Sequence, residues 1–311
     1  MKIMKKISSH LTAFTMALFL IFAFSACEKE GFFNPKQKIK RIYNVTDSGK
    51  AIQSEWTWSK NTLEKIDYYW DNKIAYTERY FYEKNRIVRI EWLNSYIRVT
   101  YDGSQFKRIE YYYKNSLETS LEFEYTAKKI SIINLTHYYS DSYFAKMQEN
   151  GFLSSIIPQE ILSSIAKCVE KHNGSKGSSE TIPIYYKYDG DNIKEVSYTY
   201  SYEEYDYWDD ETYTYTTSRS IIYDKYDTKA FNPFHKSVEL NEFGGGVSSK
   251  NLPLERRIIT IEDDMGDISQ YQSRAQYSYI LEKNFPTEVQ ITVIDEDDNS
   301  HIYKNIYEYQ E

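Results

Sequence analysis

The chain has 311 residues, a formal net charge of −8 and 27% charged residues. Hydrophobic residues make up 41% of it and 33 residues are tyrosine, so tyrosine has to fill core positions that Leu and Val usually fill. The acidic balance and the lack of heptad periodicity exclude a nucleic-acid binder, a coiled coil and a membrane helix bundle. So many large aromatic side chains can bury ample surface, which indicates a folded chain.

The first thirty residues have the layout of a secretory signal. Lys2, Lys5 and Lys6 precede an apolar run from Leu11 to Phe24, which only Thr12 and Thr15 interrupt. This run is too short to span a bilayer as a helix but suits the apolar region of a signal peptide. Residues 1–26 are therefore predicted to be a signal peptide.

The segment Phe24-Ser25-Ala26-Cys27 resembles a bacterial lipobox. The resemblance implies cleavage before Cys27, acylation of that cysteine and attachment of the chain to a lipid bilayer, with residues 27–37 as a lipidated tether. An ordinary signal peptide followed by an incidental cysteine is the alternative. Cleavage removes three of the 38 basic residues and none of the 46 acidic ones, which takes the net charge from −8 to −11. Cys168 is then the remaining cysteine, so no intramolecular disulfide is possible, and a buried structural thiol is expected.

A repeated pattern runs through the rest of the chain. Five units begin with an aromatic residue, at Trp58, Tyr82, Tyr101, Tyr125 and Tyr188. Aliphatic or aromatic residues recur five, eight and ten positions later, and turn-forming residues such as Asp102-Gly103-Ser104 lie in between. Each unit thus indicates a strand end, a tight turn and a new strand. Successive units predict an up-and-down antiparallel meander, in a single domain over residues 38–311.

The period of two along a strand predicts the faces of this sheet. Positions eight and ten, for example Ile109 and Tyr111, share an apolar face. Positions seven and nine, for example Arg108 and Glu110, share a face of alternating charge. Position five has the wrong parity for the apolar face, so either the turn extends that far or a β-bulge resets the register.

One stretch lacks strand alternation and has helical spacing instead. Ile161, Leu162, Ile165, Cys168 and Val169 recur at the spacing of one helical face. Pro158 suits a helix start, and Asn173-Gly174 suits a stop. A helix near 158–171, with a shorter one near 142–149, is expected to cover the sheet as an insert at about 140–172.

Several segments resemble the β-rich, YD-repeat-like lipoproteins of unknown function from Bacteroidota. They are Tyr188–Tyr198, the stretch from Tyr223-Asp224 to Asn232-Pro233-Phe234, Ser249-Lys250-Asn251, and Asn284 to Val289. The resemblance implies a mainly β fold, with an antiparallel sheet curled around a helix or an open half-barrel. It also implies an outer-membrane location. Glu28-Lys29-Glu30 is similar to surface-export signals of that phylum, which favours the cell surface over the periplasmic leaflet.

The sequence contains no recognisable catalytic motif. His137, His172, His235 and His301 have no ligand spacing to one another, and there is no nucleophile elbow or phosphate-binding glycine loop. The acidic runs 203–211 and 295–298 could supply oxygen ligands to calcium, but neither fits an EF-hand loop. Solvated hairpin tips are the simpler interpretation. No enzyme, cofactor or metal site is predicted.

The aromatic surplus supplies the functional hypothesis. Tyrosine is a good β-former, so its abundance has a purely structural explanation as well. The richest local cluster alternates rings with acids, and it consists of Tyr202, Tyr205, Tyr207 and Trp208. Flat rings beside carboxylates suit a neutral glycan or a protein partner. The sequence thus favours a non-catalytic surface binding module, with a structural or apolar-ligand carrier lipoprotein as the alternative.

Overall fold

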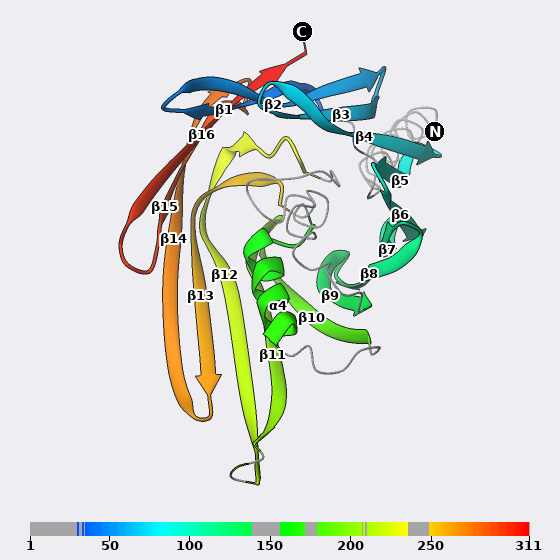
Figure 1. Ribbon diagram of the computed structural model, residues 1–311. Coiled ribbons are helices and arrows are strands. Elements are labelled where there is room, and N and C mark those ends of the chain that lie inside the picture. Colours follow the sequence, from blue (N-terminus) through cyan, green and yellow to red (C-terminus); the bar gives the residue numbers. More distant parts are fainter. Residues whose placement is uncertain are drawn as a thin grey trace, which may run out of the picture.

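The computed structural model describes residues 30, 33, 35–138, 156–171, 179–206, 208, 210–235 and 249–310. Sixteen antiparallel strands in this part of the chain form a closed barrel, with one helix inside the ring of strands (Figure 1). The first nine strands are β1 (Ile39–Thr46), β2 (Gly49–Ser59), β3 (Thr62–Trp70), β4 (Lys73–Glu83), β5 (Arg86–Trp92), β6 (Ser95–Asp102), β7 (Gln105–Tyr113), β8 (Ser116–Thr126) and β9 (Lys129–Tyr138). Helix α4 (Gln159–Lys171) follows, then β10 (Ser179–Asp189), β11 (Asn192–Asp206), β12 (Glu211–Phe231), β13 (Asn251–Asp264), β14 (Asp267–Glu282), β15 (Phe285–Ile294) and β16 (Ser300–Tyr309).

Each strand pairs with its neighbours in sequence, as the meander prediction requires. The expected open sheet or half-barrel is wrong, because β1 also pairs with β16. The register of that pairing runs from Ile39 opposite Tyr309 to Val45 opposite Lys304. Closure leaves neither strand with an unpaired edge, which removes the exposed backbone groups that an open sheet would present.

A β-bulge accounts for the parity of position five. Opposite β2, Lys65 pairs with Thr57 and Leu63 pairs with Trp58, so the register skips Glu64. The other four units skip position six in the same way, at Val88, Lys107, Ser131 and Lys194. One extra residue reverses the alternation, so positions five, eight and ten all point into the barrel. The position-five and position-eight side chains of all five units are buried.

The outward side of β3 to β7 carries the alternating charges that the sequence predicts. Ion pairs join positions seven and nine of one strand, and the closest atoms are 2.6 Å apart for Lys65–Asp67, 2.5 Å for Arg89–Glu91 and 3.4 Å for Arg108–Glu110. Across β9 to β12 the outward side also carries hydroxyl pairs, such as Thr199 with Ser218 at 2.9 Å. The barrel core is therefore mainly apolar and aromatic, and the exterior of β3 to β12 is mainly polar. The exterior of β13, β14 and β16 also exposes Ile261, Ile268, Ile280 and Ile302.

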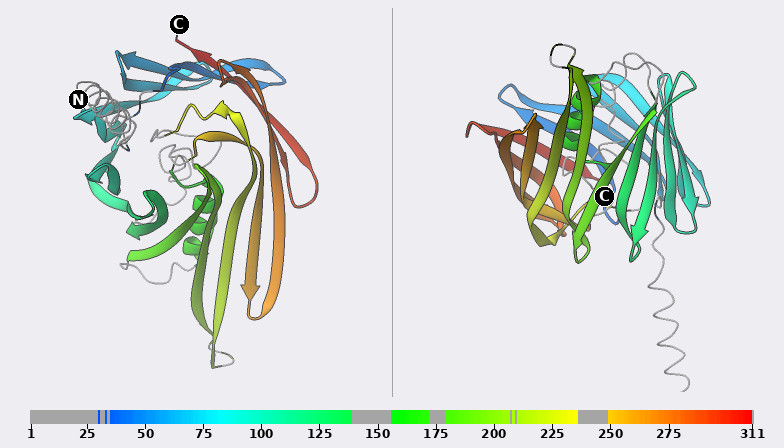
Figure 2. Two further views of the ribbon diagram at one scale, coloured as in Figure 1. Left: turned by 180° about the vertical axis from the view of Figure 1, so that it is seen from behind. Right: turned by 90° about the horizontal axis from the view of Figure 1, so that it is seen from below.

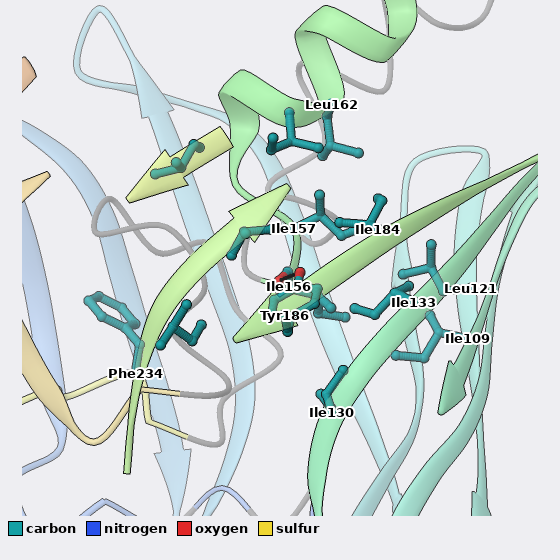
Figure 3. Packing of buried hydrophobic residues seen from close by; sticks show 14 of the residues in the cluster. Ile109, Leu121, Ile130, Ile133, Ile156, Ile157, Leu162, Ile184, Tyr186 and Phe234 are labelled. Atoms are coloured by element: carbon teal, nitrogen blue, oxygen red, sulfur yellow. Dashed lines mark hydrogen bonds between the residues drawn. The ribbon is translucent and has the colours of Figure 1, made fainter. Parts of the chain in front are cut away.

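Helix α4 lies in the interior beside β11 and β12, as Figures 1 and 2 show. It starts where the carbonyl of Pro158 accepts hydrogen bonds from the amides of Ile161 and Leu162. Its apolar residues join the aliphatic side chains of the barrel wall in one core, part of which is drawn in Figure 3. The helix occupies the range that the sequence indicates, and Cys168 is buried in it as expected. The shorter helix expected near 142–149 lies outside the described residues. Among the described residues, no helix is long and apolar enough to cross a membrane.

Successive turns alternate between the two ends of the barrel. We call one end the proximal rim, formed by the two-residue turns after β2, β4, β6, β8, β10 and β14 and by the described ends of the connection after β12. The other end, the distal rim, is formed by the connections after β1, β3, β5, β7, β11, β13 and β15. In the turn Lys84-Asn85 both residues have positive φ, 49° and 64°, as the type I′ geometry of a tight hairpin requires. Strand β1 begins and strand β16 ends at the proximal rim, where the amide of Gln310 donates a hydrogen bond to the carbonyl of Lys38 at 2.8 Å.

Candidate functional site

The predicted binding cluster sits at the far end of the β11–β12 hairpin, and its members point in different directions. Tyr202 shares the inward face of β11 with the buried Val196 and Tyr198, whereas Tyr205, three residues further, lies on the outward face. The hydroxyl of Tyr205 bonds Asp210 across the tip. Trp208 stands at the tip with 95% of its surface exposed. Tyr207 lies outside the described residues, as does Cys27.

The hairpins that carry this region project beyond the rest of the distal rim (Figure 1). Strands β11 to β14 have 15, 21, 14 and 16 residues, whereas β3 to β8 have between 7 and 11. The pairing of β11 with β12 has no register shift from Glu195 to Asp206. Inward and outward faces therefore keep their identity along the whole projection.

The inward face of the projection carries a line of tyrosines, which we call the tyrosine wall: Tyr200, Tyr202, Tyr213 and Tyr215. Tyr202 and Tyr215 are directly opposite each other, and their rings stack with centroids 5.0 Å apart and planes 12° apart. Tyr200 is buried, and its hydroxyl donates to Glu180 at 3.1 Å. The wall thus begins in the core and becomes half-exposed toward the tip.

Carboxylates flank the exposed part of this wall. Asp264 on β13 pairs with Tyr215, and Glu204 on β11 pairs with Tyr213, so both lie on the inward face, and both are exposed. Burial, followed by the negative charges of Glu204 and Asp264, raises the pKa of the Tyr202 hydroxyl. The phenol therefore stays protonated at neutral pH and can donate a hydrogen bond. Ring faces, hydroxyl donors and carboxylate acceptors line one surface.

The base of the wall is fixed to helix α4. The Tyr198 hydroxyl donates to Ser164 Oγ at 2.5 Å, and the thiol of Cys168 lies 3.9 Å away. The guanidinium of Arg219 donates to the carbonyl of Glu160 at 3.0 Å. Arg256, whose side chain is buried, forms an ion pair with the Glu160 carboxylate. The helix therefore holds β11, β12 and β13 together where the projection leaves the barrel.

The described histidines do not form a catalytic or metal-binding group. His137 is buried, which lowers its pKa to about 4. His235 contacts the carbonyl of Ser249 at 3.0 Å through Nδ1, and His301 lies 3.9 Å from Asp295. Within the described ranges, no group of three or more His, Cys, Asp or Glu residues could hold a metal ion.

The acidic run 295–298 is organised as a turn. Asp295 Oδ1 accepts hydrogen bonds from the amides of Asp297 and Asn299, at 3.1 Å and 2.8 Å. Desolvation acts to raise the pKa of Asp295, but these bonds outweigh it and lower the pKa. The run forms the exposed tip between β15 and β16, which fits the hairpin interpretation.

A hollow lies near the proximal end between β1, β2 and β16. It encloses about 590 Å³, and Trp56, Trp58 and Tyr309 are among its lining residues. The indole nitrogens donate to Ser54 Oγ at 3.0 Å and to the Ile39 carbonyl at 2.8 Å. The Tyr309 hydroxyl donates to the Pro286 carbonyl at 2.8 Å. The aromatic hydrogen-bond donors of this hollow are thus already paired within the protein. The carboxylates beside the tyrosine wall, Glu204 and Asp264, are by contrast exposed to solvent.

Glu30, three residues after the predicted acylation site, is held at the proximal rim. The Glu30 carboxylate accepts hydrogen bonds from the amide of Phe106 at 2.5 Å and from the hydroxyl of Tyr125 at 2.6 Å. Its carbonyl accepts a bond from Arg86 at 2.8 Å. Burial raises the pKa of Glu30. Phe33 is buried between Trp56 and Trp58, with ring centroids 6.4 and 5.5 Å away.

Comparison with known proteins gives a likeness of fold and no family. The chain matches no family model and no curated protein. Among solved structures it is similar to a porin-like protein from Bacteroides vulgatus, with 11% identity, a TM-score of 0.47, and coverage of 88% of this chain and 99% of that one. A porin-like protein from Bacteroides uniformis is similar at 9% identity and a TM-score of 0.34, with coverage of 92% and 100%. At these values neither likeness assigns a function to this chain.

Proposed function

We propose that this chain is a lipid-anchored, non-catalytic barrel of the outer membrane that binds a neutral glycan along the tyrosine wall. The stack of Tyr202 on Tyr215, with Asp264 beside Tyr215, is the observation that carries the proposal. Half-exposed ring faces can pack against the apolar faces of sugar rings, and the adjacent carboxylates can accept bonds from sugar hydroxyls. An anionic glycan would be repelled by the same carboxylates.

The exterior of the barrel supports attachment through an anchor instead of through the strands. In a membrane-spanning barrel the outward face is an apolar band and the lumen is polar. Here the outward face of β3 and β5 carries ion pairs such as Lys65–Asp67 and Arg89–Glu91, so the exposed isoleucines of β13, β14 and β16 do not continue into an apolar band around the barrel, and the core is mainly aliphatic and aromatic. Each Arg or Lys facing the middle of the bilayer would cost about 2–4 kcal/mol. We infer that the barrel stands in water and is held at the membrane by acylated Cys27, at the cell surface.

A glycan array probed with the chain from residue 27 onward, carrying Cys27→Ser to keep it in solution, tests the binding proposal. Retention of neutral oligosaccharides, with loss of retention in Tyr215→Ala, would support it. The control is Thr216→Ala, because Thr216 is the next residue along β12, faces outward and bonds Ser201 at 2.9 Å. Equal retention by both variants, or retention of acidic glycans alone, would contradict the assignment.

A structural role is the second candidate, and the position of helix α4 favours it. A helix that fills the barrel interior is expected of a scaffold, because it leaves that part of the lumen without room for an apolar ligand. Ile161, Leu162 and Ile165 are fully buried against the wall. Failure of every glycan and protein partner to bind the tyrosine wall would leave this role as the better account.

A further inference from the structure

The tether between the predicted anchor and the barrel is very short. Cys27 and Glu30 are three residues apart in the sequence. Even fully extended, three residues span only about 10 Å. Since Glu30 is bonded to Phe106, Tyr125 and Arg86 at the proximal rim, acyl chains on Cys27 would hold this rim within about 10 Å of the membrane surface.

The two rims differ strongly in charge. The described connections of the proximal rim, from the residue before each one to the residue after it, carry seven basic and five acidic residues: Lys60, Lys84, Arg86, Lys128, Lys129, Lys250 and Lys283, with Glu83, Asp102, Asp189, Asp191 and Glu282. Counted in the same way, the described connections of the distal rim carry two basic and eleven acidic residues: Lys73 and Lys114, with Asp47, Asp71, Asp206, Asp210, Glu211, Asp264, Asp267, Asp295, Glu296, Asp297 and Asp298. The acidic character of the chain is concentrated at the end opposite the tether.

We propose that the proximal rim is a docking surface for the anionic headgroups of the bilayer, so that the barrel stands upright with its distal rim facing away. The proposal rests on the acylation of Cys27 proposed above. Anionic headgroups attract lysines within a Debye length and repel carboxylates. The exposed Lys60, Lys84 and Lys128 can approach such a surface. The distal rim is kept away from it, because it lies at the end opposite the tether and its carboxylates are repelled by the headgroups. This orientation presents the tyrosine wall to the medium.

Distance-dependent quenching in vesicles tests the orientation. The full acylated chain, in a Cys168→Ala background, would carry a dye on Ser59→Cys at the proximal rim or on Ser116→Cys at the distal rim, because both serines are exposed. The vesicles would contain phosphatidylglycerol and a lipid with a quencher on its headgroup. We expect strong quenching of the dye at residue 59 and little at residue 116. Equal quenching, or stronger quenching at residue 116, would overturn the orientation while leaving the anchor in place.

Failure of the anchor gives a different result. If the acylated wild-type preparation does not float with the vesicles, the membrane attachment itself is wrong, and the orientation falls with it. The two failures are therefore distinguishable by flotation before any quenching is measured.

A charge-reversal experiment tests the headgroup contact directly. The unacylated Cys27→Ser chain is mixed with phosphatidylglycerol vesicles at low salt, and the bound fraction is measured by sedimentation. We expect binding that high salt abolishes. The pair Lys60→Glu and Lys84→Glu should lower the partition coefficient by roughly fivefold or more per lysine. The matched distal pair, Lys73→Glu and Lys114→Glu, should leave it unchanged. Equal losses in both pairs, or no binding of the parent chain, would contradict the proposal.

Discussion

Tyr202 and Tyr215 stack across strands β11 and β12, with ring centroids 5.0 Å apart and planes 12° apart. The pair lies on the inward face of a projection that emerges from the barrel core, where helix α4 fixes its base. Aromatic pairs opposite each other on one sheet face contribute about 0.2–1 kcal/mol relative to alanine. Because this energy is small, either ring can be replaced without unfolding the barrel, so a role of the rings in binding can be tested separately from their role in the fold.

The two faces of β7 should respond very differently to an introduced acid. Ile109 is inward and fully buried, so Ile109→Asp should unfold the barrel, because an unpaired buried ion costs several kcal/mol. Arg108→Asp removes an exposed-face partner of Glu110 and Glu122 and should cost about 1 kcal/mol or less. Urea unfolding of both variants measures the difference. Equal losses of stability would mean that the assigned register is wrong.

Helix α4 should depend on the ion pair between Arg256, which is buried, and Glu160, which is half-buried. Arg256→Met leaves the partly solvated Glu160 carboxylate without this partner and should destabilise the protein by about 1–3 kcal/mol. The double variant Arg256→Met with Glu160→Gln should recover a large part of that loss, since no charge is then left unpaired. A double-mutant cycle from urea unfolding gives the coupling. If the double variant loses as much unfolding free energy as the sum of the two single variants, the two side chains are not coupled and the pair does not hold the helix.

Acid should weaken the barrel through His137. Burial lowers the pKa of this histidine from 6.5 to about 4, so the unfolded chain binds a proton more readily than the native protein between those values. The stabilisation is complete above pH 6.5 and is lost as the pH falls toward 4, by at most about 3 kcal/mol. His137→Phe should flatten the dependence of unfolding free energy on pH in this window. If the unfolding free energy of this variant depends on pH as steeply as that of the parent chain, groups other than His137 cause the acid sensitivity.

Trp208 should make no contribution to stability. Its side chain is 95% exposed at the hairpin tip, and exposed substitutions usually change stability by less than about 0.5 kcal/mol. Trp208→Ala is therefore expected to melt within about 2 °C of the parent chain. A loss of many degrees by calorimetry would show that the ring packs against the protein and would contradict its exposed position at the tip.

The local pattern predicts much of this fold because it reports which side of a strand is buried. Ile66, Ile90 and Ile109 lie inward, and Lys65, Arg89 and Arg108 lie outward, as a period of two requires. The tight turns follow from residues such as Lys84-Asn85 that adopt positive φ. The sequence left open whether position five belongs to the turn or to a bulge, and the register shows the bulge.

Closure could not be predicted in the same way. Pairing of Ile39 with Tyr309 joins residues from opposite ends of the chain, and their own sequences look the same in an open sheet. The sequence pattern therefore predicts a sheet with two free edges. The number of strands, their lengths and their tilt decide closure together, and none of these is visible in a single repeat.

Only part of the candidate site can be predicted from the sequence. The spacing of three between Tyr202 and Tyr205 already places them on opposite faces of a strand, which separates the predicted cluster. The partner of Tyr202 is Tyr215, thirteen residues away, and it is identified only by the register of the hairpin. Asp264 comes from a further strand, and no local pattern connects it with either ring.

The most direct test of the binding proposal compares Tyr202→Ala with Tyr205→Ala, two changes of the same residue type three positions apart on β11. The dissociation constant of the neutral oligosaccharide best retained on the array is measured by calorimetric titration, after both variants are shown to melt like the parent chain. Tyr202→Ala should weaken binding by about 2 kcal/mol, as loss of a central aromatic contact does. Tyr205→Ala, on the outward face, should leave the dissociation constant within a factor of two. Equal weakening by both, or weakening by Tyr205→Ala alone, would contradict the assignment of the tyrosine wall as the binding surface.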